Sequence, residues 1–137
     1  MRYLLDTDVV SQATKERPHA AVVRWLDEQD EDDLFLSVAT LLEIRVGIEL
    51  RAVSKKREEL ERWLVHDLPQ RFDERIVPIE RHVADLTGRL IARSRSEGWE
   101  MGSMDALIGA TAMVHDMGLA TLNRAHFERL GVELAEF

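Results

Sequence analysis

The chain has 137 residues, a formal net charge of −8 and no cysteine. A chain of this length is near the usual size of one domain and can bury roughly two thirds of its unfolded surface, so we expect a single domain over residues 1–137. The lack of cysteine excludes disulfides and thiolate metal sites. The negative charge excludes a binder of phosphate backbones that relies on a basic surface over the whole molecule. Any contact with nucleic acid must therefore be local or assisted by metal ions.

The N-terminus lacks the pattern of a secretory signal, in which basic, apolar and small residues follow one another. No apolar run approaches the roughly 18 residues that a membrane-spanning helix needs. We therefore expect a protein of the reducing cytoplasm that makes no membrane contact.

Short apolar runs alternate with helical patterns along the chain. Strands are expected at 3–5, 34–38, 76–79, 119–121 and 132–135. Helices are expected at 6–13, 19–29, 39–52, 54–71, 80–97 and 103–117, with a helical turn at 124–130. Strands separated by helices predict a parallel sheet that is covered on both faces. The expected fold class is α/β, an α/β/α sandwich with a parallel sheet of about five strands.

Two local features modify this pattern. The acidic run 27–33 is expected to be a solvated loop. Pro69 is expected to end the helix at 54–71 early, because proline lacks the amide hydrogen that a helix interior uses.

Three carboxylates occur where packing would favour apolar side chains. Asp6 follows the first strand, and Asp105 is the only charged residue between Met101 and Val114. Glu43 looks inward, because its helical neighbours are small or uncharged: Ala39, Thr40, Val46 and Gly47. Each acid follows a predicted strand end or helix start, so the topology brings all three to one edge of the sheet. Buried acids need a cation or a proton, and clustered acids favour a hard divalent cation.

Each acid also has a purely structural interpretation. Asp6 is a candidate cap for the first helix, as is Asp8, and Glu43 is a candidate partner for Arg45 or Arg89. Asp105 follows Ser103, a candidate N-cap, and an acid in a first turn is favoured by the helix dipole. Together these interpretations require three independent coincidences at one edge of the sheet.

A fourth polar segment lies at residues 120–127. Thr121 and Asn123 follow a predicted strand, where a hydroxyl and an amide are suited to orient a carboxylate or hold water. Asn123 is equally suited to cap the next helix. The histidines show no paired ligand spacing, which argues against zinc. The chain has neither a nucleophile elbow nor a glycine-rich phosphate loop.

These segments, in this order, resemble the PIN-domain ribonucleases, specifically the VapC/FitB toxins of type II toxin–antitoxin pairs. The resemblance covers nearly the whole chain through residues 4–11, 43–47, 105–112 and 121–127. It implies an endoribonuclease that depends on Mg²⁺ or Mn²⁺. Asp6, Glu43 and Asp105 match the family's metal-binding acids, and Asn123 joins them as a catalytic residue.

Two departures from the family pattern concern the metal. Asp8 stands where the family usually has asparagine, which adds a charge near the site. Asn123, and then His126, stand where many members carry a fourth acid. The first metal ion is therefore better supported than a second. The resemblance also implies the partners: an RNA substrate, a DNA-binding antitoxin encoded next door, and a second copy of the chain in a homodimer.

The expected mechanism is metal-assisted hydrolysis of an RNA phosphodiester. Asp6 and Asp105 would hold the principal metal, and Glu43 would position or deprotonate the attacking water. Arg89 and Arg93 on one helix face are the best candidates to guide the RNA backbone, although a solvated face is the more common reason for such a pair.

Two other classes of protein remain open. A phosphatase of the haloacid-dehalogenase type would use Asp6 as its nucleophile, but it needs a lysine beyond the midpoint. The only lysines are Lys15, Lys55 and Lys56, which argues against this class. The other alternative is a PIN-like module without catalysis, whose acids only pair with a basic partner.

Overall fold

Four short parallel strands form the centre of the molecule. The computed structural model describes all residues 1–137 and contains β1 (Tyr3–Leu5), β2 (Leu34–Ser37), β3 (Ile76–Val77) and β4 (Gly118–Ala120). Their order across the sheet is β3-β2-β1-β4, and all neighbouring pairs are parallel. From β1 the chain moves outward to β2 and β3, and it returns on the other side of β1 as β4. The sheet therefore changes direction at β1, and such switch points hold the binding crevices of α/β folds.

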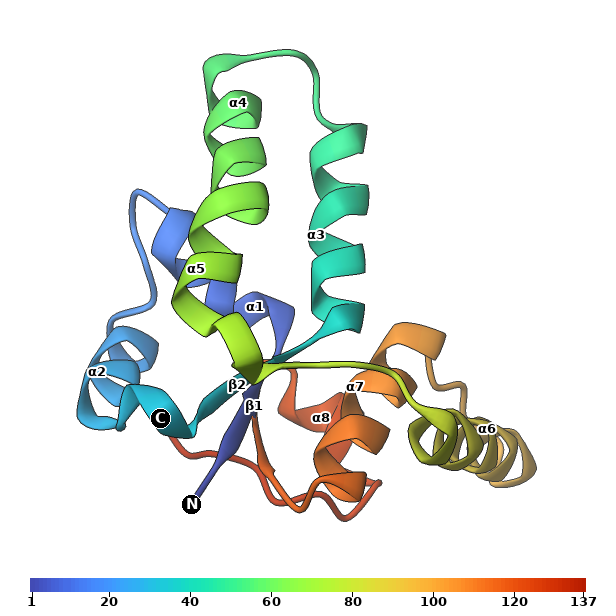
Figure 1. The fold of residues 1–137 in the computed structure, drawn as a ribbon. Coiled ribbons are helices and arrows are strands. Elements are labelled where there is room, and N and C mark those ends of the chain that lie inside the picture. The colour runs from blue at the N-terminus through green and yellow to red at the C-terminus, as the bar shows by residue number, and fades with distance from the viewer.

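Helices cover both faces of this sheet (Figure 1). One group consists of α6 (Arg81–Ser96), α7 (Ser103–Val114) and α8 (Arg124–Glu128). The other group consists of α1 (Thr7–Val10), α2 (Ala20–Glu28), α3 (Val38–Leu50), α4 (Lys55–Arg62) and α5 (Leu68–Phe72). The expected α/β/α sandwich is confirmed.

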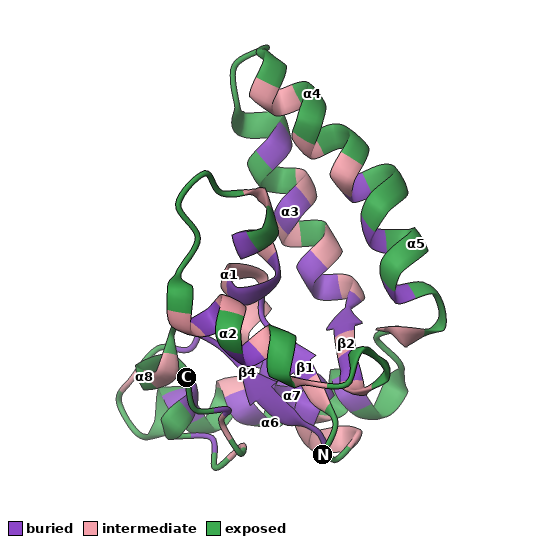
Figure 2. Cartoon of the chain, turned by 90° about the vertical axis from the view of Figure 1, so that its left-hand side faces the viewer, coloured by how far each residue is buried: buried purple, intermediate pink, exposed green.

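The two faces have separate hydrophobic cores because side chains alternate along a strand. Leu4 and Leu119 pack with residues of α6, α7 and α8. Leu5 and Ala120, their immediate neighbours in the sequence, pack with residues of α1, α2, α3 and α5 on the opposite face. Figure 2 shows that burial is concentrated in the strands and the helix faces that meet them, whereas α4 is largely exposed. The short apolar strands thus hold both layers together.

The segment at 132–135 does not form the fifth strand that the sequence predicts. It is reduced to a single bridge between Leu119 and Leu134, in which Leu119 bonds to Glu133 and Ala135 over 2.8 and 2.9 Å. In a parallel strand, alternate residues direct their backbone groups to opposite edges. The groups of Gly118 and Ala120 already bond toward β1, so a strand of three residues has only Leu119 left for an outer neighbour.

The expected helix over 54–71 is continuous in direction but not in hydrogen bonding. A π-helical stretch at Trp63–Asp67 separates α4 from α5. Pro69 does not end the helix, contrary to the sequence prediction, and α5 continues to Phe72. Pro69 lies in the first turn of α5, where a missing amide hydrogen costs little.

The acidic run at 27–33 is more ordered than the predicted loop. Its first two residues complete α2, and Glu31–Asp33 forms a 3-10 turn capped by Asp30. Glu31 accepts a hydrogen bond from Arg71 over 2.7 Å, and this bond lowers the pKa of the Glu31 carboxyl. A cation from another part of the chain thus fixes the run.

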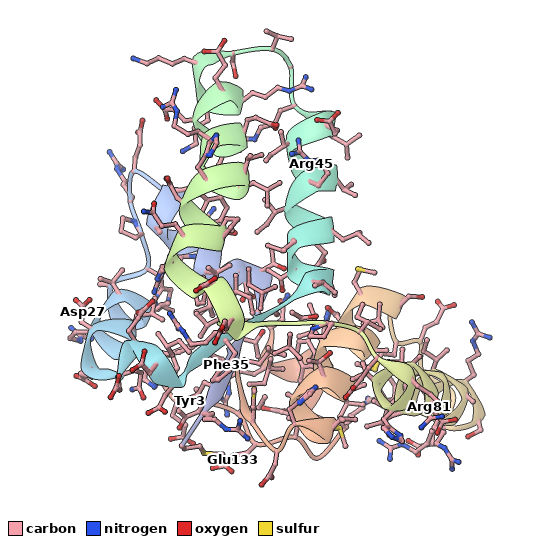
Figure 3. All side chains as sticks on the ribbon, viewed as in Figure 1. Tyr3, Asp27, Phe35, Arg45, Arg81 and Glu133 are labelled. Atoms are coloured by element: carbon pink, nitrogen blue, oxygen red, sulfur yellow. The ribbon has the colours of Figure 1, made fainter.

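The helices α3 and α4 extend together away from the sheet, as Figure 1 shows. Arg45 on α3 joins them by donating to both carboxylate oxygens of Glu61 on α4, over 2.5 and 3.2 Å (Figure 3). None of the helices combines the length and apolar character needed to span a bilayer.

Candidate active site

Asp6 lies at the carboxyl end of β1, directly before α1. Its side chain is the N-cap of α1, since Oδ1 accepts the Thr7 amide hydrogen over 2.8 Å. Its other oxygen, Oδ2, accepts the hydroxyl hydrogen of Thr121 over 2.8 Å. The residue is only 4% exposed. The capping interpretation is therefore correct, but it accounts for only one of the two carboxylate oxygens.

The environment of Asp6 disfavours its charge. Burial, and after it the nearby carboxylates of Asp8 and Asp105, raise the pKa of Asp6 to about 7, although hydrogen bonds from Thr121 and Thr7 act in the opposite direction. Burial also raises the pKa of Asp8. Such shifts are typical of functional sites, where charges of one sign are held together.

Asp8 belongs to the site more closely than the sequence indicated. Both of its carboxylate oxygens accept the backbone amide hydrogen of Leu122, over 3.3 and 3.2 Å. This contact ties α1 to the segment that follows β4. The available signal was the position of Asp8 two residues after Asp6, in a motif that starts at a strand end.

Glu43 is held by a threonine and not by an arginine. The hydroxyl of Thr7 donates to Glu43 Oε1 over 2.7 Å. The predicted alternative, a pair with Arg45 or Arg89, is wrong because Arg45 bonds to Glu61 and Arg89 bonds to Asp85 over 2.9 Å. Sequence reasoning missed Thr7, although its place between Asp6 and Asp8 was a signal.

Asp105 is the third residue of α7. The helix starts at Ser103, and Gly102 occupies the N-cap position without a side-chain cap, so Ser103 does not cap this helix as predicted. The Asp105 carboxylate pairs instead with His126 of α8, with 2.9 Å between Oδ2 and Nδ1. Sequence reasoning considered His126 only as a zinc ligand and in the departure from the family pattern.

Asn123 stands at the N-cap position of α8, but its side chain makes no capping hydrogen bond. Its backbone amide donates to the hydroxyl oxygen of Thr121 over 3.0 Å. The prediction that Thr121 orients a carboxylate is confirmed, since Thr121 relays this contact to Asp6. The side-chain amide of Asn123 thus remains available to the cavity described next.

The acids gather around one polar cavity of about 460 Å³, which no hydrophobic residue lines. Its walls include Asp6, Asp8, Lys15, Glu43, Asp105 and Asn123. We call it the acidic cavity. The structure thus brings together the four residues singled out from the sequence, and Lys15 is the only cation among the residues that line the cavity.

The side chains do not form a group of three or more acidic or histidine residues arranged to hold a metal ion. Their chemistry nevertheless fits a hard divalent cation, which prefers carboxylate and amide oxygens. The raised pKa of Asp6 points the same way, because uncompensated negative charge causes part of it. A cation would relieve this repulsion.

Arg89 and Arg93 do not offer free charge for an RNA backbone. Arg89 pairs with Asp85 over 2.9 Å, and Arg93 lies 3.8 Å from Glu97, in each case four residues along α6. These arginines therefore lie on a solvated face of α6, which is the more common reason for such a pair.

The chain is similar to known proteins over nearly its whole length. The family model for the PIN domain matches residues 3–133. The toxin FitB of Neisseria gonorrhoeae is 33% identical over 124 residues, which are 90% of this chain and 89% of that protein. A VapC ribonuclease of Sinorhizobium fredii is 30% identical over 131 residues, which are 96% of this chain and 94% of that protein. The match to the family model includes every residue that lines the acidic cavity.

Solved structures agree with the sequence matches. The crystal structure of FitAcB from Neisseria gonorrhoeae superposes with a TM-score of 0.88 at 31% identity, covering 98% of this chain and 96% of that chain. A structure of FitAB bound to an IR36 DNA fragment gives a TM-score of 0.87 at 32% identity, covering 97% of this chain and 93% of that chain. The similarity therefore extends over the complete sandwich.

Proposed function

The chain belongs to the PIN-domain family, and on this premise we propose that it is a metal-dependent endoribonuclease, the toxin of a type II toxin–antitoxin pair. The observation that carries the proposal is the acidic cavity, where the carboxylates of Asp6, Asp8, Glu43 and Asp105 meet at the switch point of the sheet. The similarity to a VapC ribonuclease and to the toxin FitB supports the activity and the biological role.

The proposed cofactor is Mg²⁺ or Mn²⁺, held by Asp6 and Asp105 with Glu43 completing the acidic set. The ion would lower the pKa of water and stabilise charge on the phosphoryl oxygens. Asp8 adds a fourth carboxylate to the same cavity. His126 does not line the acidic cavity, but it bonds to Asp105 and keeps that carboxylate oriented.

The other residues position groups for hydrolysis. Thr121 holds Asp6, and Thr7 holds Glu43, so neither carboxylate has to be ordered when the substrate arrives. Glu43 would orient the attacking water and accept its proton. The side-chain amide of Asn123 would bind water or a phosphate oxygen at the cavity wall.

The partners follow from charge and exposed surface. A net charge of −8 and an acidic cavity suit a basic segment of an antitoxin, which would block the site. For the homodimer, Leu42, Val46 and Leu50 are 50%, 49% and 81% exposed at four-residue spacing on α3. Residues with this spacing share one helix face, and such an apolar stripe suits a self-complementary contact between two copies.

The alternatives are weaker. Membership of the PIN family replaces the haloacid-dehalogenase assignment. A binding module without catalysis would not need carboxylates crowded enough to raise the pKa of Asp6, since crowding costs stability when no cation is present.

The test is cleavage of single-stranded RNA by the purified chain. We expect cleavage with Mg²⁺ or Mn²⁺ and none in EDTA. Asp105→Asn should lower the rate by at least about 100-fold, the upper range for losing even an outer partner of a metal ligand. The matched control is Asp27→Asn, at an exposed position on α2 away from the site (Figure 3).

Thermal unfolding should show that both variants are folded. Equal rates for wild type and folded Asp105→Asn, or cleavage that survives EDTA, would contradict the proposal.

A further inference from the structure

A second cavity lies beside the acidic one and shares a wall with it. It has a volume of about 330 Å³, and its lining includes Trp99, Glu100, Met101, Asp105, His126 and Arg129. Asp105 also lines the acidic cavity. A group bound here would therefore lie next to whatever is bound at the carboxylates. We call it the side pocket.

The side pocket offers a flat apolar platform. Trp99 packs against the core of the α6, α7 and α8 layer, and its indole nitrogen donates to Glu97 over 3.2 Å. The ring is therefore held in place before any ligand arrives. Met101, which is buried, supplies a second apolar surface.

The cation of the side pocket is free of acidic partners. The guanidinium carbon of Arg129 lies 5.0 Å from the centre of the Trp99 ring. Its side chain makes no ion pair and no hydrogen bond, unlike Arg89 and Arg93, which pair with neighbouring acids. An arginine stacked on tryptophan keeps its hydrogen-bond donors directed outward, so these donors remain available to a ligand.

We infer that the side pocket binds one unpaired nucleobase of the RNA, adjacent to the scissile phosphate. The inference rests on the proposed nuclease function and names its specificity site. Proteins recognise single-stranded RNA by stacking bases on aromatic rings or arginine planes and by hydrogen bonds to the base edges. Both surfaces are present here, and about 300 Å³ is the lower end of the range for ligand pockets, which suits one base.

Guanine matches the polar groups best. Arg129 supplies donors, and Glu100 supplies an acceptor. Guanine carries the acceptors O6 and N7, for which arginine is the common partner, and donors on its other edge. We therefore expect a preference for guanine at one position next to the cut.

The first test does not depend on cleavage. Guanosine has no charge, so the carboxylates do not repel it, and it can be titrated in EDTA while tryptophan fluorescence is followed. We expect saturable quenching in the wild type and in Arg62→Ala, which removes an exposed charge on the distant α4. Quenching should be lost in Arg129→Ala, whose substitution lies on the surface and does not disturb the core. Absent quenching in the wild type, or equal quenching in Arg129→Ala, would overturn the inference.

The second test uses cleavage of a pool of single-stranded RNAs with a randomised segment. Trp99→Ala and Arg129→Ala should raise KM for the preferred RNA by at least about fivefold and flatten the preference at one position. Trp99→Phe should restore it, because phenylalanine keeps a stacking surface. A preference for another base that still depends on Trp99 supports the subsite and changes only the base.

The outcomes separate the two proposals. A wild type that cuts no RNA but binds guanosine through Arg129 contradicts the nuclease and supports the side pocket. A wild type that cuts RNA with the same preference in every variant contradicts the side pocket alone. If Trp99→Ala and Arg129→Ala weaken only antitoxin binding, the pocket belongs to a protein partner and the inference is wrong.

Discussion

The hydroxyl of Thr121 donates to Asp6 Oδ2 over 2.8 Å and joins the ends of two adjacent strands across 115 residues of sequence. Through this contact the last strand controls the charge and orientation of the first acid of the chain. The hydrogen bond lowers the pKa of Asp6, while burial and Asp8 raise it. Thr121 is therefore a positioning residue for Asp6.

Substitution of Thr121 should shift the pH dependence of cleavage. In Thr121→Val the pKa of Asp6 should rise above about 7, so the acid limb of the rate profile should move to higher pH. The rate near pH 7 should fall about tenfold, as for losing an outer partner of a metal ligand. Thr121→Ser should restore both, because it keeps the hydroxyl. A profile that stays in place in folded Thr121→Val would show that this bond does not tune Asp6.

The stability of the metal-free protein should depend on the charge of Asp6. The pKa of Asp6 is 3.8 in an ordinary setting and about 7 in the folded chain. Between these values the folded state keeps a proton that the unfolded state has released. The protonation of Asp6 therefore stabilises the folded state fully at low pH. This stabilisation is lost as pH rises between the two pKa values, at about 1.4 kcal/mol per pH unit.

Urea unfolding in EDTA measures this effect. Asp6→Asn cannot ionise, so its stability should gain on that of the wild type between pH 5 and pH 8. Added Mg²⁺ should stabilise the wild type at pH 8 and leave Asp6→Asn nearly unchanged. A constant difference between the two proteins across this range would contradict the linkage.

The products of cleavage should carry a 5′-phosphate and a 3′-hydroxyl. In the proposed reaction water attacks phosphorus, and the 3′ oxygen of the upstream nucleotide leaves. The 2′-hydroxyl takes no part in bond formation, so a substrate with one 2′-deoxy sugar at the scissile position should still be cut. End analysis of the products checks both points. A 2′,3′-cyclic phosphate among the products would contradict this reaction. It would show that the ribose 2′-hydroxyl attacks phosphorus, with a general base such as His126.

Expression together with the neighbouring gene should yield a stable complex with a small antitoxin. The mass of the complex should correspond to at least two copies of this chain, because the stripe on α3 is apolar and exposed. Val46→Glu should reduce the copy number without affecting guanosine binding. The reason is that Val46 lies on α3, whereas the side pocket is lined by residues 99–129. A monomer that captures no partner would count against the toxin assignment.

Local patterns in the sequence were sufficient for the layers and for the placement of the acids. Apolar runs separated by helical periodicity predicted the parallel sheet with helices on both faces, and four strands appear where expected. The sequence predicted Asp6, Glu43 and Asp105 at one edge because each follows a strand end or helix start, and it predicted Asn123 at the end of a strand. The structure brings all four to one cavity. A residue's place along a strand or helix is a local property, so these predictions needed no knowledge of distant contacts.

The partners of the acids were decided by tertiary structure. Thr7 bonds to Glu43, 36 residues away in the sequence, and His126 bonds to Asp105, 21 residues away. The predicted arginine partners of Glu43 bond to other acids: Arg45 to Glu61 and Arg89 to Asp85. Tertiary structure also determines that residues 132–135 form a single bridge and not a fifth strand, because the outer edge of β4 is short. A hydrogen bond forms only when donor and acceptor come within about 3 Å in a suitable direction. Periodicity in the sequence predicts which face of an element a residue occupies. The distance between a donor and an acceptor on different elements depends on how those elements pack in three dimensions.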